Sequence, residues 1–160
     1  MYELDEFDRK LLNIIQNDAS LTAEQMAEQV SLSASAIQRR LKRLRKDGVI
    51  ERQIAVIDPR HAGRPNTFIV SVLVERETPE RLSRFRSWLI AQPNIQQIFY
   101  VTGDADYILV VTAPDTDTYD RLMSELVGDN PNVKRFTTHV ALTVIKRGLS
   151  IPLPIAHDAE

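Results

Sequence analysis

The chain has 160 residues, a formal net charge of −2 and no cysteine. Hydrophobic and charged residues make up 43% and 26% of it, proportions that exclude a disordered chain, and the lack of cysteine excludes disulfides and thiolate metal sites. No apolar run approaches the roughly 20 residues that a bilayer span needs, and the start of the chain lacks the pattern of a secretory signal, so we expect a cytoplasmic protein without membrane contact.

The first part of the chain predicts two short helices in succession. Apolar residues recur at helical spacing across residues 5–17, with acidic residues in the first turn, where the helix dipole favours them. Thr22 is followed three residues later by Gln25, a capping-box pattern that opens a second helix.

A third helix is predicted over residues 34–47. Ser33 can cap its N-terminus, and Gly48 stands where a left-handed C-cap residue belongs. Because only a tight turn at residues 31–33 separates the second and third helices, the three helices predict a helix-turn-helix.

The two faces of this third helix differ in chemistry. Ile37, Leu41 and Leu44 form an apolar stripe for a core, whereas six of the 20 basic residues of the chain lie between Arg39 and Lys46, opposed locally only by Asp47. The alternative interpretation is a solvated charged face, but the lack of interleaved acidic residues favours DNA. Polar groups near the N-terminus would read base edges, and later cations would bind phosphate. The predicted DNA-binding residues are Ser33, Ser35, Gln38, Arg39, Lys42, Arg43 and Lys46.

A strand and a linker are predicted after the third helix. Residues 49–57 alternate loosely and could form a wing or an arm that pairs with a partner chain, and Pro and Gly concentrate in residues 58–66. We therefore predict a winged helix-turn-helix domain over residues 1–57, a hinge over 58–66, and a second domain over 67–160.

The second domain predicts strands and helices in the order βαββαβ, an α+β ferredoxin-like arrangement. The expected elements are a strand at 68–74, a helix at 79–91, strands at 95–102 and 107–112, a helix at 117–127 and a strand at 133–145. Helices would cover one face of the antiparallel sheet. The apolar residues of 68–74 and 140–145 predict that the other face is buried against a second copy.

Four ordered motifs carry a family resemblance. L-D-E-F-D-R-K-L-L at residues 4–12, L-S-A-S-A-I-Q-R-R-L-K-R-L at 32–44, G-V-I at 48–50 and T-G-D-A-D-Y at 102–107 resemble the Lrp/AsnC family of feast/famine transcription regulators. The resemblance implies a sequence-specific DNA-binding regulator controlled by a small effector, an amino acid. It further implies a homodimer that assembles into tetramers or octamers; a two-fold dimer would prefer pseudo-palindromic sites on double-stranded DNA.

The loop between the second and third strands of the second domain is the predicted effector site. Asp104 offers a carboxylate for an ammonium group, and Gly103 permits close approach of backbone N–H groups to a carboxylate. The alternative is a simple hairpin turn. The family resemblance favours the effector and adds Thr138 on the last strand. The predicted effector-binding residues are Tyr100, Thr102, Gly103, Asp104, Asp106 and Thr138.

No other chemistry is indicated. His61, His139 and His157 are far apart and lack the spacing of metal ligands, and no motif indicates an enzyme or a cofactor. Two alternatives to a nucleoid-associated regulator remain open. One is an architectural DNA-compacting protein; the other is an enzyme on the same two-domain scaffold, against which the basic helix argues.

Overall fold

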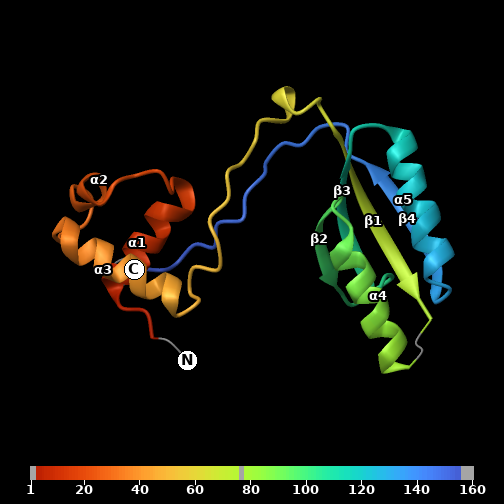
Figure 1. Ribbon diagram of the computed structural model, residues 1–160, viewed down its shortest axis with the longest axis horizontal. Helices are drawn as coiled ribbons and strands as arrows, with labels where there is room; N and C mark the ends of the chain where they lie inside the picture. The colour runs from red at the N-terminus through yellow and green to blue at the C-terminus, as the bar shows by residue number, and fades with distance from the viewer. Residues whose placement is uncertain (1–2, 76–77, 156–160) are drawn as a thin grey trace. The chain divides into compact units, whose positions relative to one another are not determined.

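The structure, a computed structural model, describes residues 3–75 and 78–155, so His157 lies outside the described residues. The chain forms two compact units (Figure 1). The first contains the residues up to Val56 together with those from Lys146 onwards, and the second contains Ile57–Ile145.

Three helices form the first unit, as predicted, and each begins at a side-chain cap. Asp5 accepts from the Asp8 N–H, Thr22 and Gln25 form a reciprocal capping box, and Ser33 accepts from the Ala36 N–H. Each cap satisfies backbone donors that the first helical turn leaves unpaired. The helices are α1 (Glu6–Asn17), α2 (Ala23–Ala27) and α3 (Ala34–Lys46).

The three helices share a small apolar core. Leu11 of α1 and both Ile37 and Leu44 of α3 have no exposed surface, and Met26 of α2 is 3% exposed. The stripe predicted for the third helix therefore faces the core, which leaves its opposite face free for contacts outside the unit.

The wing predicted after α3 is not formed within the described chain. Gly48 has φ 71°, and the N–H groups of Val49 and Ile50 both donate to the Leu44 carbonyl, so the first residues turn back onto the helix end. Residues 51–58 have no regular structure, and only a short 3₁₀ turn, η1 (Pro59–His61), precedes the second unit. A strand needs a neighbour for its backbone groups, and among the described residues no strand pairs with this segment.

The second unit has the predicted βαββαβ order and an antiparallel sheet with strand order β2-β3-β1-β4. Its elements are β1 (Asn66–Val74), α4 (Pro79–Ala91), β2 (Ile95–Tyr100), β3 (Tyr107–Ala113), α5 (Thr116–Asp129) and β4 (Val133–Val140).

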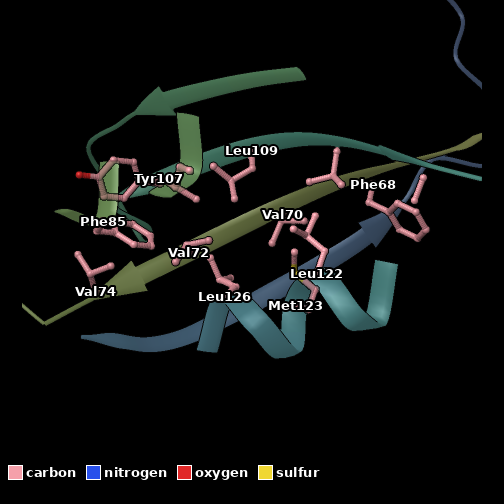
Figure 2. Close-up of a cluster of buried hydrophobic side chains, with 13 residues drawn as sticks. Phe68, Val70, Val72, Val74, Phe85, Tyr107, Leu109, Leu122, Met123 and Leu126 are labelled. Carbon is pink, nitrogen blue, oxygen red and sulfur yellow. The ribbon is translucent and has the colours of Figure 1, made fainter. Parts of the chain in front are cut away.

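The two faces of the sheet have different environments. Even-numbered residues of β1 pack with residues of α4 and α5 in one cluster, of which Val70, Val72, Phe85 and Leu126 are at most 1% exposed (Figure 2). Successive side chains of a strand alternate between faces, so the odd-numbered residues Ile69, Ser71 and Leu73 lie on the face that the helices do not cover. The predicted open face therefore involves only alternate residues of 68–74.

The C-terminal part departs from the sequence-based prediction. The last strand ends at Val140, not at residue 145. The Ala141 N–H still donates to the Thr67 carbonyl, but the partner strand β1 begins only one residue further on, at Asn66, so it is too short to pair with residues up to 145. Residues 146–155 belong to the first unit, whereas the sequence placed them in the second domain. The end of the domain at residue 160 lies outside the described residues.

Candidate nucleic-acid interface and effector site

An uninterrupted polar and basic surface runs along α3. Ser35, Arg39, Lys42 and Lys46 follow one another at steps of four, three and four residues, which places them in one row on the helix, and all four are exposed. Gln38 and Arg45 flank this row on one side and Arg43 on the other. The row is suited to contact a groove and its phosphates without disturbing the core.

Two of the basic residues have partners on α1. Arg40 Nη1 lies 2.6 Å from Asp5 Oδ2 and 2.8 Å from Asp8 Oδ1, and Arg43 Nη2 lies 3.0 Å from Asp8 Oδ2. Asp47 is the only acidic residue beside these cations in the sequence, but in the fold they have further acidic partners. Those partners are Asp8 of α1 and its N-cap residue Asp5.

The ion pair between Asp5 and Arg40 shifts the pKa values of both groups. Burial acts to raise the pKa of Asp5, but hydrogen bonds from the Asp8 N–H and from Arg40 outweigh it, so the pKa is lowered. The hydrogen bond to Asp5 raises the pKa of Arg40. Both shifts favour the charged forms, which hold α3 against α1.

The remaining residues at the ends of α3 have local roles. Ser33 Oγ accepts from the Ala36 N–H at 3.3 Å and lies 3.2 Å from Ser35 Oγ, so the helix cap already uses its hydroxyl. Arg45 Nη2 donates to Gln53 Oε1 at 3.3 Å, a contact between exposed side chains. Both serines remain exposed and stay predicted DNA contacts.

The loop after β2 is attached to the sheet by Asp106. Its backbone N–H donates to the Val72 carbonyl, and its carboxylate accepts from the Val74 N–H at 2.9 Å. Gly103, at φ 118°, adopts a conformation that residues with side chains rarely take. Asp106 therefore fixes the loop, while Thr102, Gly103 and Asp104 remain exposed.

Asp104 and Ala105 border a small hollow on the uncovered face of the sheet. Its other lining residues are Ser71, Leu73, Arg135, Thr137 and His139. A carboxylate and a guanidinium thus lie around one hollow with two hydroxyl groups, a set that matches the ammonium and carboxylate of an amino acid. Its volume of about 160 Å³ is below the roughly 300–1,000 Å³ of ligand pockets, so one chain does not enclose a ligand here.

Two predicted effector residues lie elsewhere in this chain. Thr138 faces the helices, where its hydroxyl hydrogen-bonds to Tyr119, whose ring stacks on Phe68 at 3.9 Å. Tyr100 is the last residue of β2, which lies at the opposite edge of the sheet from β4. The centroid of its ring lies 5.2 Å from Arg86 Cζ. The structure therefore brings together Asp104 and residues of β1 and β4, but not Tyr100 with Thr138.

Sequence reasoning missed Ser71, Arg135, Thr137 and His139. The alternation of β4 would have placed 135, 137 and 139 on one face, but the register that brings them beside Ser71 required the sheet pairing.

Among the described residues, no helix is long and apolar enough to cross a bilayer. In the same part of the chain, no group of three or more His, Asp or Glu side chains has the arrangement of a metal site.

A helix-turn-helix with an exposed basic row, joined to a βαββαβ unit, defines a DNA-binding transcriptional regulator with a ligand domain. Residues 67–151 match the Lrp/AsnC ligand binding domain family, and residues 4–51 match a winged helix-turn-helix DNA-binding family. The chain belongs to the Lrp/AsnC family.

Individual relatives agree with this assignment. The chain is 42% identical to the HTH-type transcriptional regulator y4tD of Sinorhizobium fredii, over 96% of this chain and 90% of that protein. The crystal structure of an AsnC family transcriptional regulator from Agrobacterium tumefaciens superimposes with a TM-score of 0.86 at 30% identity, covering 93% of this chain and 97% of that one. A transcriptional regulator of Neisseria meningitidis, solved with L-Met, has the same fold, with a TM-score of 0.84 at 24% identity over 97% and 99% of the chains.

Proposed function

We propose that this transcriptional regulator binds a free amino acid at the loop of residues 102–106 and that the bound amino acid controls its contact with DNA. The observation that carries the proposal is the position of the Asp104 carboxylate and the Arg135 guanidinium around one hollow. Free amino acids carry one ammonium and one carboxylate, so these two groups discriminate them from neutral metabolites. That a regulator of the same fold has been solved with L-Met supports the choice of ligand class.

The hollow needs a second copy of the chain to become a closed site. Phe99 on the same open face is 49% exposed, and the extended segment after α3 exposes Ile54 and Val56 by 59% and 80%. Both surfaces are suited to pair with their counterparts in a second copy, by sheet packing and by strand addition. We propose a homodimer that assembles further, to tetramers or octamers, so that a neighbouring copy closes the site. Tyr100, which is 65% exposed at the edge of the sheet, is available to contribute from that copy, whereas Thr138 is held by Tyr119 of its own chain.

A dimer of this kind would place two α3 helices on DNA, which favours pseudo-palindromic half-sites about one helical turn apart. Within each half-site we assign base reading to Gln38 and Arg39, at the N-terminal end of the exposed row. Phosphate contacts fall to Lys42, Arg43 and Lys46 further along. Such a protein would act on the nucleoid.

Calorimetric titration of the full chain with each of the twenty amino acids tests the ligand. We expect at least one to bind with a dissociation constant below about 1 mM, which corresponds to roughly 4 kcal/mol. Asp104→Ala should abolish this binding heat. Asp117→Ala, which removes an exposed carboxylate at the start of α5, should retain it. Failure of all twenty to bind would refute amino-acid sensing, and equal losses in both variants would refute the assigned site.

A further inference from the structure

The C-terminal segment lies in an extended form against α1, where two side-chain amides bind its backbone. Asn13 Nδ2 donates to the Leu153 carbonyl at 2.8 Å, and the Leu153 N–H donates back to Asn13 Oδ1 at 3.1 Å. Gln16 Nε2 donates to the Ile151 carbonyl at 3.1 Å, and the Ile151 N–H donates to Gln16 Oε1 at 2.6 Å. Each amide therefore satisfies both backbone groups of one tail residue.

The spacing of the two partners matches. Residues three apart on a helix have Cβ atoms about 5–6 Å from each other, and alternate residues of an extended chain are about 6.5 Å apart. Asn13 and Gln16 can thus hydrogen-bond to Leu153 and Ile151, two residues on the same side of an extended chain. Leu153, between the two prolines, also packs against the core of the three helices.

The tail sequence I-P-L-P-I is suited to this mode of binding. Pro152 and Pro154 have no N–H that could be left unpaired. They alternate with Ile151 and Leu153, whose N–H groups donate to the side-chain amide oxygens of α1. Proline also restricts the free segment to extended conformations, which lowers the entropy lost on docking. The same alternation would not suit a strand paired along both edges.

We propose that the α1 surface around Asn13 and Gln16 is a peptide-docking site whose occupant is the C-terminal segment 151–153 of the same chain. The chain passes between the two units after Val56 and again after Ile145. The docked segment (blue in Figure 1) makes the second passage end on α1, the helix that Asp8 also ties to α3. The segment that follows β4 therefore ends in contact with a helix of the DNA-binding unit.

Hydrogen exchange of the full chain, followed by amide, tests the docking. The N–H groups of Ile151 and Leu153 should exchange at least tenfold more slowly than that of exposed Leu149. Asn13→Ala with Gln16→Ala should remove this protection while α3 stays protected. Asn17→Ala is the matched control, since the Asn17 amide donates to the Asn13 carbonyl of its own helix, and it should retain the tail protection. Fast exchange of both tail amides in the wild type, or protection that survives the double substitution, would overturn the proposal.

A crosslink determines which chain provides the tail. Because the chain has no cysteine, Asn17→Cys with Ile151→Cys creates a single reactive pair that a short bis-maleimide can join, and it leaves the amides of Asn13 and Gln16 in place. We expect a crosslinked product that migrates as one chain under denaturing conditions, and a much lower yield when Asn13→Ala and Gln16→Ala are added to the same pair. A product that migrates as two chains, or a yield that the two added substitutions leave unchanged, would contradict docking within one chain.

Discussion

Asp8 on α1 and Arg43 on α3 form an ion pair, in which Arg43 Nη2 lies 3.0 Å from Oδ2 and 3.2 Å from Oδ1 of the carboxylate. The Asp8 side chain is 1% exposed, whereas that of Arg43 is 47% exposed. The pair therefore anchors the helix that carries the DNA-binding row, while about half of the Arg43 side chain stays exposed beside that row.

Removing the buried carboxylate should destabilise the first unit. Asp8→Ala leaves Arg40 and Arg43 without their shared acceptor, and we expect a loss of about 2–3 kcal/mol in the free energy of unfolding. Denaturant titration followed by helix circular dichroism measures this loss. Glu24→Ala, on the exposed side of α2, should change the free energy by less than about 0.5 kcal/mol. Equal stability of Asp8→Ala and wild type would show that the ion pair makes no net contribution to the free energy of unfolding.

The exposed row of α3 should divide into base-reading and phosphate-binding residues. We expect Arg39→Ala to cost about 1–3 kcal/mol on a site selected from random DNA and to relax the preference at one base pair. Lys46→Ala should weaken the binding of all DNA sequences alike. It should also reduce the slope of log affinity against log salt concentration by about 1, the contribution of one phosphate contact. Gel shifts on selected and scrambled DNA separate the two, and Arg84→Ala on α4 is the control. Equal losses on both DNAs for Arg39→Ala would refute its role in reading bases.

Acid should weaken the contact between α1 and α3 in a defined direction. The folded chain lowers the pKa of Asp5 below its ordinary value of 3.8, so the contribution of Asp5 is fully present above pH 3.8 and is lost as the pH falls through the folded pKa. Thermal melts between pH 7 and pH 2 should show a smaller acid-induced loss for Asp5→Ser, which keeps a neutral N-cap but cannot titrate. An identical pH dependence of the two proteins would contradict a stabilising charge at Asp5.

The two aspartates of the effector loop should differ in their effects on stability. Asp106→Ala leaves the Val74 N–H without its acceptor, and we expect a loss of about 1–2 kcal/mol in the free energy of unfolding of the second unit. Asp104→Ala, at an exposed loop position, should stay within about 0.5 kcal/mol of wild type. Chemical denaturation of the unliganded proteins tests this contrast, which would fail if Asp104→Ala were the more damaging.

The sequence predicted the elements and missed most of what depends on long-range pairing. Helix caps at Thr22 and Ser33 and the strand periods are local signals, so the helix-turn-helix and the βαββαβ order could be predicted. The pairing of Arg43 with Asp8 spans 35 residues, and the docking of Leu153 on Asn13 spans 140. Neither leaves a periodic signal in the sequence. The loop between β2 and β3 could be predicted, and its role as an effector site stays a prediction. Its neighbours on β4 depend on strand register.

An amino acid held at the Asp104 loop should change the affinity for DNA, and by linkage DNA should change the affinity for the amino acid by the same factor. Fluorescence anisotropy of labelled operator DNA, titrated with the full chain in the absence and presence of a saturating amino acid identified by calorimetry, measures this directly. We predict a shift of about fivefold or more in the midpoint for wild type. For Asp104→Ala we predict no shift, with unliganded affinity within about twofold of wild type. Superimposable wild-type curves with and without an amino acid that binds would contradict the claim.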